Sequence, residues 1–179
     1  ATALAACGRS VLLIDFDPQG NASTGLGIDD RAHNSYSLIA GSSDSNESIQ
    51  KTQVPGLDII PTVVDLSAAE VELSDMPDRE FRLRGSISRI SASYDYIIID
   101  CPPSLGMLTV NALASATSVL VPLQCEFYAL EGLSQLMRTI DAVKAGLNGA
   151  LSLQGIVLTM FDSRNKLSAM VANDVRDHF

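Results

Sequence analysis

The sequence of 179 residues predicts an α/β fold: a doubly wound, mostly parallel sheet with helices on both faces. Two observations lead to this prediction. Short runs of Ile, Val and Leu recur along the chain, and stretches with helical periodicity separate them. The apolar runs are continuous and do not alternate with polar residues, which is typical of strands covered on both faces. A sheet of this kind binds its ligands beyond the carboxyl ends of its strands.

The apolar runs predict five strands, at residues 10–15, 57–61, 96–100, 118–122 and 155–160. Periodicity and a glycine stop predict helices at residues 1–8, 78–92, 127–145 and 165–178. Ser67 and Glu70 have the spacing of a capping box, so another helix is expected to begin there. The serine-rich stretch 41–48 is expected to be a surface loop within one domain.

Composition excludes several function classes. The chain is 46% hydrophobic and 18% charged, as globular domains are. It has no signal peptide and no apolar run near the roughly 20 residues of a membrane span, so we expect a soluble, cytoplasmic protein without a membrane partner. The formal net charge of −9 opposes nucleic-acid binding over most of the surface, and the arginines within 79–89 are interpreted as a solvated helix face. The three cysteines are far apart, which argues against a disulfide framework or a metal–thiolate site.

Three aspartates lie at the carboxyl ends of predicted strands. Asp15 and Asp17 end the strand at 10–15, and Asp100 ends the strand at 96–100. Parallel neighbouring strands bring such ends together, so these carboxylates are expected to form a cluster of hard oxygen ligands suited to Mg²⁺. Because Mg²⁺ usually binds together with phosphate oxygens, a nucleotide is the expected ligand.

Each strand end continues into a distinctive turn. After Asp17 come Pro18, Gln19, Gly20 and Asn21, and after Asp100 come Cys101, Pro102, Pro103 and Ser104. Prolines stiffen the second turn, and the Ser104 hydroxyl lies near a predicted helix start. We interpret residues 18–21 and 101–104 as candidate switch segments that sense a γ-phosphate, with ordinary strand-to-helix turns as the alternative.

Four stretches then carry a resemblance: "VLLIDFDPQGNASTGLG", "YDYIIIDCPPSLGMLTVNAL", "VLVPLQCEFYALEGLSQL" and "GIVLTMFDSRNKLS". In this order, over nearly the whole chain, they resemble the ParA/Soj family of chromosome- and plasmid-partitioning ATPases, which are deviant-Walker P-loop NTPases. MinD-type proteins lack the "DPQ-N" continuation and the "CPPSLG" form. Iron–sulfur carriers of the same class need cluster cysteines that this sequence does not supply.

The resemblance implies a role for each acid. Asp17 matches the residue that positions the attacking water in ATP hydrolysis, and Asp15 matches the acid that supports the magnesium shell. Asp100 matches the Walker B aspartate, which holds magnesium through a water molecule, and residues 101–106 match switch II. The stretch that lies beside the adenine is matched by Thr159, Met160, Phe161 and Asp162.

Residues 126–132 match a part of the family near the dimer surface. For Phe127, Leu130 and Leu133, however, we favour core packing of an amphipathic helix.

One family element is not found in this sequence. The lysine-bearing deviant Walker A loop would lie just before Ala1, and the glycine-rich "GNASTGLG" has no lysine and follows the wrong strand. We therefore expect residues 1–179 to be a fragment of a single ATPase domain. The first strand and the P-loop are expected before Ala1, and further strands, helices and a DNA-binding surface after Phe179.

For the intact protein the resemblance implies an ATPase that uses ATP and Mg²⁺. It would dimerise on ATP, bind DNA non-specifically in the nucleoid-associated cytoplasm, and hydrolyse ATP when a ParB-type partner stimulates it. A MinD-like or other deviant-Walker ATPase, and a catalytically silent interaction fragment, stay open as alternatives. A phosphoacceptor receiver domain also gathers acids at strand ends, but it needs a lysine after its last strand, where this sequence has Arg164.

Overall fold

The computed structural model describes residues 1–126 and 129–178. The chain divides into two compact units, residues 1–115 and residues 116–179, and each is described by itself. Within the described residues, no helix combines the length and the apolar character needed to cross a bilayer.

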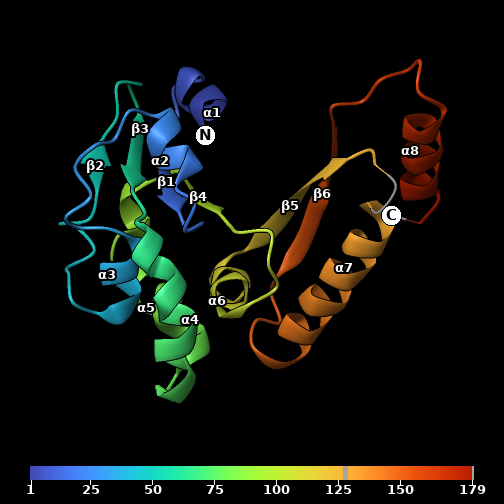
Figure 1. The fold of residues 1–179 in the computed structure, drawn as a ribbon. Helices are drawn as coiled ribbons and strands as arrows, with labels where there is room; N and C mark the ends of the chain where they lie inside the picture. Colours follow the sequence, from blue (N-terminus) through green and yellow to red (C-terminus); the bar gives the residue numbers. More distant parts are fainter. Residues whose placement is uncertain (127–128, 179) are drawn as a thin grey trace. The chain divides into compact units, whose positions relative to one another are not determined.

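The first unit is built on a four-stranded sheet with the order β2-β3-β1-β4 (Figure 1). β1 (Val11–Asp15) runs parallel to both of its neighbours, β3 (Leu57–Ile60) and β4 (Tyr96–Asp100). The strands predicted at 10–15, 57–61 and 96–100 are therefore confirmed. The short edge strand β2 (Gln50–Lys51), antiparallel to β3, was not predicted.

Helices cover both faces of this sheet, as the fold class requires. Leu12 and Ile14 of β1 pack into one core with residues of α3 (Ser35–Ala40), α4 (Ala69–Glu72), α5 (Arg82–Ile87) and α6 (Met107–Ser115). Val11 and Leu13 pack on the other face with residues of α1 (Thr2–Ala6) and α2 (Asn21–Gly25). Every residue of β1 is buried, which agrees with its continuous apolar run.

The capping box expected at Ser67 and Glu70 is wrong. A 3₁₀ turn already begins at Val64, and the Ser67 hydroxyl donates to the Val64 carbonyl at 2.9 Å. Ser67 therefore lies inside a turn instead of beginning a helix, and α4 starts after Ala68 without a side-chain cap. Glu70 is left with a different environment, described below.

Three other local expectations differ in detail. The helix predicted at 78–92 is a 3₁₀ turn, then α5, then a second 3₁₀ turn, although Leu83 and Ile90 are buried as the periodicity indicates. Helix α3 was not predicted, and the Asn34 side chain caps it by accepting from the Ser37 amide at 3.0 Å. The loop 41–48 is partly internal, because Ser45 is buried and donates to the Ser86 carbonyl.

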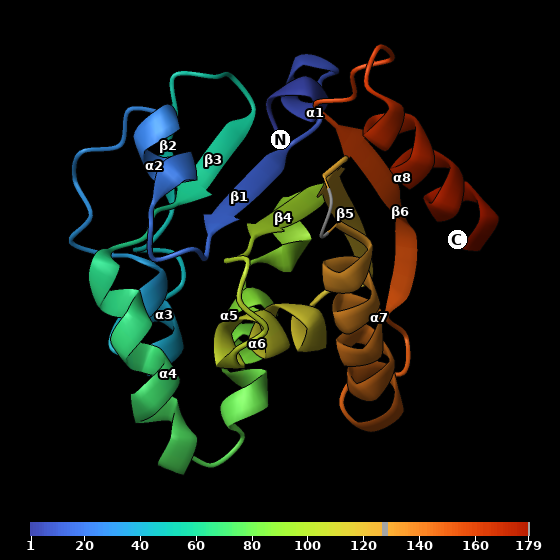
Figure 2. The same ribbon diagram turned by 45° about the vertical axis from the view of Figure 1, so that its right-hand side comes forward.

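The second unit pairs β5 (Ser118–Gln124) with β6 (Ser152–Thr159) in parallel, as predicted, beside α7 (Ala129–Gly146) and α8 (Lys166–His178) (Figure 2). Leu133 lies in the core between α7 and β5, and Leu130 packs against that core, so core packing is confirmed for both. Phe127 lies outside the described residues. Leu120 of β5 and Val157 of β6 keep 59% and 45% of their surface exposed, so these strands are less covered than β1.

Candidate functional site

Asp15 ends β1 as a fully buried carboxylate that anchors the start of α2. Its Oδ2 accepts the Ser23 hydroxyl at 2.6 Å and the Ser23 amide at 2.7 Å. Ser23 Oγ in turn accepts the Thr62 amide at 3.1 Å, and the Ser35 hydroxyl donates to the Asp15 carbonyl at 2.7 Å. Hydrogen bonds to the charged form of a buried carboxylate offset the loss of its hydration. Asp15 is therefore fixed by its neighbours before any ligand is present.

Asp17 begins a tight turn that leads into α2. Its Oδ1 accepts the Gln19 amide at 3.0 Å, and its carbonyl accepts the Gly20 amide at 2.9 Å. Gly20 closes the turn with φ of 66°, in the left-handed region that favours glycine. Pro18 fits a turn that needs a fixed φ. The turn holds the half-buried Asp17 carboxylate at the end of β1.

Asp100 joins the other two acids from the neighbouring strand. In the parallel register Asp15 lies opposite Asp100, and the Phe16 amide donates to the Asp100 carbonyl at 2.8 Å. Asp100 keeps exposed surface, but partial loss of water raises the pKa of its carboxyl above the ordinary value. The charges of Asp15 and then Asp17 raise this pKa further. The three acids are thus close enough to repel one another.

The second candidate switch segment, residues 101–104, leaves β4 directly after Asp100. Loss of water raises the pKa of the Cys101 thiol to about 12 even though the residue retains exposed surface, and Asp100 and Asp17 contribute to this shift. At its far end the Ser104 carbonyl accepts the Thr109 hydroxyl at 2.6 Å, which ties the segment to α6. Ser104 thus contributes its carbonyl at the start of this helix.

Both candidate switch segments line one cavity of about 290 Å³ in the first unit. Its wall includes the acid Asp17 and residues of both segments. It also includes Ser67, in the 3₁₀ turn before α4, and Glu70, in α4. The lining residues are Asp17, Pro18, Gln19, Ser67, Glu70, Pro102, Pro103, Ser104 and Leu108. The structure therefore brings together the candidate water-positioning acid and most of the residues predicted as switches. Asn21, the first residue of α2, is exposed and is not among the lining residues.

The carboxylates fit a magnesium ion that takes most of its ligands from elsewhere. Among the described residues no group of three or more His, Cys, Asp or Glu side chains is arranged to hold a metal ion. Mg²⁺ typically keeps several waters and uses one or two carboxylates together with phosphate oxygens. Partial burial and then the charges of Asp15 and Asp17 raise the pKa of Asp100, and a nearby cation would relieve the repulsion between these charges. Asp100, the more exposed acid, is better placed for this than Asp15, whose Oδ2 is already used.

The residues predicted beside the adenine lie in the second unit, where β6 ends. Met160, with φ of 52°, is 79% exposed, and Phe161 is 46% exposed. Asp162 forms an ion pair with Arg164 at 2.9 Å, which lowers the pKa of Asp162. Thr159 is the last residue of β6, paired in register with Gln124. An exposed apolar pair after a strand end suits a surface for a planar ring, and this assignment stays a prediction.

Sequence reasoning missed two residues of the site. Ser23 hydrogen-bonds Asp15 and also Thr62, which lies 39 residues after Ser23, and no local sequence pattern predicts this tertiary contact. Glu70 was interpreted as part of a helix cap, whereas its side chain lines the cavity. The only feature of Glu70 that could have indicated a functional role is its carboxylate. The solvent-exposed neighbour Glu72 also carries one, so the sequence does not distinguish the two.

Comparison with known proteins gives one consistent result. A family model described as an AAA domain matches residues 1–153. The chromosome partitioning protein ParA of Caulobacter vibrioides is 56% identical over 182 residues, covering 99% of this chain and 68% of the relative. ParA of Myxococcus xanthus is 53% identical, covering 100% of this chain and 64% of the relative. The sporulation initiation inhibitor protein Soj of Bacillus subtilis is 47% identical, covering 98% and 70%.

Solved structures match over almost the whole of this chain. A Mycobacterium smegmatis protein named cobyrinic acid a,c-diamide synthase, solved with ADP and magnesium, matches with a TM-score of 0.93 and 38% identity, covering 99% of this chain and 73% of that one. The same protein was also solved with an ATP analogue and magnesium. A plasmid partition protein of Borrelia burgdorferi matches with a TM-score of 0.84 and 26% identity, covering 98% and 76%.

Proposed function

The chain belongs to the ParA/Soj family of partitioning ATPases, and from this premise we propose that the intact protein is an ATP-driven switch in chromosome or plasmid partitioning. It dimerises on binding ATP, binds DNA without sequence preference, and leaves DNA after hydrolysis stimulated by a ParB-type partner. The present chain spans 64–70% of the length of the three relatives described above. The proposal therefore concerns the longer protein.

The observation that carries this proposal is the cluster of Asp15, Asp17 and Asp100 beside a cavity that both candidate switch segments line. An acid cluster at adjoining strand ends, with two turns able to follow a bound phosphate, is the arrangement that a nucleotide switch needs. The magnesium-bound nucleotides in the related Mycobacterium smegmatis structures support the choice of ATP and Mg²⁺ as ligands.

Each acid has its own task in the proposed site. Bound Mg²⁺ supplies charge neutralisation for the phosphates. Asp100 would help to hold the ion by accepting a hydrogen bond from one of its waters, and Asp15, opposite Asp100 in the strand register, would support it. Asp17 accepts a hydrogen bond from the attacking water and orients it for in-line attack. Residues 18–21 and 101–104 change position with the γ-phosphate, and residues 159–162 lie beside the adenine.

The phosphate-binding loop and its lysines belong, in this proposal, to the segment that precedes Ala1 in the intact protein. The DNA-contacting surface belongs mostly to the part beyond Phe179. This division is consistent with the formal net charge of −9 on residues 1–179, which opposes DNA binding. The protein acts in the cytoplasm, at the nucleoid.

The role of Asp17 is tested in the full-length protein by comparing Asp17→Ala and Asp17→Asn. Asn retains an oxygen that can accept the Gln19 amide, so it preserves the turn and removes the charge. Both variants should bind ATP and dimerise but lose about 100-fold or more in turnover, and they should stay on DNA after ATP is added. The exposed Asp29, changed to Ala, is the control. Normal turnover in Asp17→Asn would refute the assignment.

A further inference from the structure

Glu70 carries a carboxylate oxygen that the fold does not explain. It is the second residue of α4, and its Oε1 is buried without a hydrogen-bond partner in the described part of the chain. Leaving such an oxygen without a donor is unfavourable, because it has given up water and gained nothing in return. An Ala or Leu at this position would avoid that penalty. The acid is therefore a candidate for a role outside folding.

The Glu70 carboxylate fills the space that a side chain at residue 106 would need. A Cβ added at Gly106 would overlap Glu70 Oε1 and would lie 2.9 Å from Glu70 Cδ. The φ of Gly106 is not in the left-handed region, so backbone conformation does not require glycine here. Glycine is required because the Glu70 carboxylate lies so close to residue 106. The Gly106 carbonyl accepts the Val110 amide at 3.1 Å, so Gly106 belongs to the first turn of α6. Because Glu70 packs on Gly106, the acid lies against the start of this helix.

Glu70 also faces the cavity that the two candidate switch segments share. Asp17, Pro102 and Ser104 line the same cavity. Of the residues that line the cavity, Asp17 and Glu70 are the two that carry charge. Glu70 thus packs on Gly106, two residues after the second candidate switch segment, and lines the same cavity as the candidate water-positioning acid.

We infer that Glu70 is a positioning residue for residues 102–106, and this inference rests on the proposed function. Its carboxylate holds the segment by close packing on Gly106. A helix leaves its first amide N–H groups without intrahelical acceptors, and a negative charge is favourable there. In the arrangement that hydrolyses ATP, the unpaired oxygen of Glu70 accepts an amide N–H from the start of α6. This contact sets the part of the cavity wall that Pro102, Pro103 and Ser104 form.

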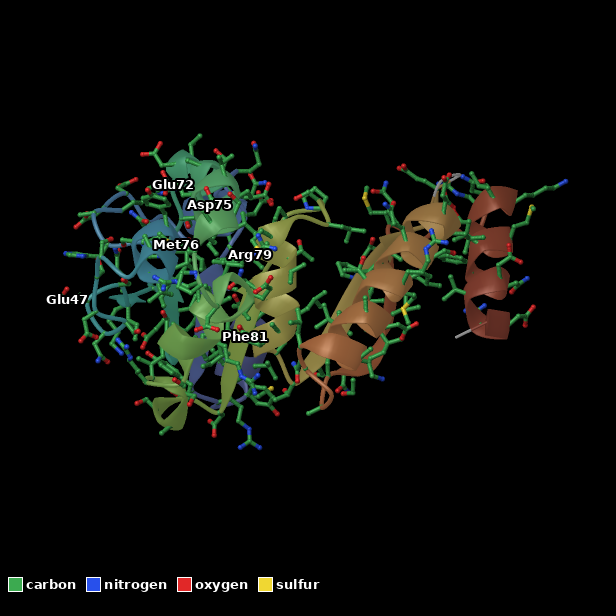
Figure 3. All side chains as sticks on the ribbon, turned by 90° about the horizontal axis from the view of Figure 1, so that it is seen from below. Glu47, Glu72, Asp75, Met76, Arg79 and Phe81 are labelled. Atoms are coloured by element: carbon green, nitrogen blue, oxygen red, sulfur yellow. The ribbon has the colours of Figure 1, made fainter. Side chains whose placement is uncertain are left out.

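The first experiment measures ATP turnover by the full-length protein and its variants Glu70→Gln, Glu70→Ala and Glu72→Gln. Glu72 lies on the same helix and is exposed, which makes it the matched control (Figure 3). It accepts the Tyr36 hydroxyl at 2.9 Å. Glu70→Ala should lower kcat about tenfold or more with KM for ATP unchanged, because misplacement affects the reacting geometry and not uniform binding. Glu70→Gln, which keeps an acceptor oxygen, should lose less, and Glu72→Gln should match the wild type. An unchanged kcat in Glu70→Ala, or a parallel change in KM, would overturn the inference.

The second experiment tests the contact itself with a double-mutant cycle. Gly106→Ala alone should disturb the start of α6, because the new Cβ meets the carboxylate. In a Glu70→Ala background the same change should do no further harm. Hydrogen exchange of residues 107–115 in the nucleotide-free protein gives the readout, and Glu70→Ser serves as a second shortened variant should Glu70→Ala unfold. Additive effects would overturn the inference. This cycle needs no ATP, so it tests the contact between Glu70 and Gly106 even if the wild-type protein does not hydrolyse ATP. Failure of the wild type to hydrolyse ATP would refute the proposed function and not this contact.

Discussion

Replacing Ser23 by Ala should destabilise the protein by more than a surface serine does. Ser23 is fully buried, and its hydroxyl connects the start of α2 to two other segments. It donates to Asp15 Oδ2 at 2.6 Å and accepts the Thr62 amide at 3.1 Å. The first bond is to an ionised group, and the second satisfies a buried amide. Ala removes both and leaves the Asp15 carboxylate with the Ser23 amide as its nearest donor.

The expected size follows from these two bonds. A hydrogen bond to a charged group contributes about 1.5–3 kcal/mol, and a buried amide left without an acceptor costs about 1–3 kcal/mol. Because the two terms overlap at one oxygen, we expect a loss of about 3 kcal/mol in the free energy of unfolding. Urea unfolding of the full-length protein, followed by circular dichroism, measures it. Ser88→Ala, at an exposed hydroxyl that donates to the Gly85 carbonyl, should change less than about 0.5 kcal/mol. A loss below about 1 kcal/mol for Ser23→Ala would refute the reasoning.

Three further outcomes are expected. Asp100→Asn should raise the thermal stability of the nucleotide-free protein near neutral pH, because partial burial and then the charges of Asp15 and Asp17 raise the pKa of Asp100, so its ionisation opposes folding. The gain should shrink as the pH falls and wild-type Asp100 takes up its proton; a gain that persists in acid would contradict this origin. Gly20→Ala should lose about 1–2 kcal/mol in urea unfolding, because φ is 66° and the new Cβ would lie 2.8 Å from Arg31 Nη1. Gly25→Ala, which meets open space, is its control, and equal midpoints for the two would argue against strain at Gly20. Cys101, whose pKa is raised to about 12, should react slowly with iodoacetamide near neutral pH despite its exposed surface. In a Cys7→Ser background, Asp100→Asn should speed that reaction, as followed by peptide mass spectrometry, and an unchanged rate would exclude Asp100 as a cause.

The sequence predicts the strands of this protein well because burial acts on each strand separately. β1 is flanked by two strands and covered on both faces, so selection for a stable core leaves a continuous apolar run that can be recognised without its partners. The two-residue strand β2 lacks such a run, since its pairing at the sheet edge depends on the position of β3. Local pattern fails again at Ser67 and Glu70. The capping-box spacing is present, but an earlier turn at Val64 takes Ser67 into its own hydrogen bond.

The candidate site likewise has features that the sequence predicts and features that it does not. Strand ends and parallel register bring Asp15 and Asp100 together, and both features can be predicted from the apolar runs that precede the acids. The bonds that fix those acids cannot, because they join residues far apart in sequence. Ser23, in α2, donates to Asp15, and the Thr62 amide after β3 donates to Ser23. Predicting these bonds requires the positions of α2 and of the segment after β3, and those positions depend on the packing of the whole unit.

Asp15 and Asp100 belong to one cluster but differ in how their carboxylates are held. Asp15 is held by hydrogen bonds from the Ser23 amide and hydroxyl, whereas the pKa of Asp100 is raised, which disfavours the charge of Asp100. A ligand that supplies positive charge gains most from Asp100 and disturbs Asp15 least. Residues 101–104 follow directly from Asp100, and three of them line the cavity that Glu70 also lines. The acid whose charge is disfavoured is thus the one directly followed by the second candidate switch segment.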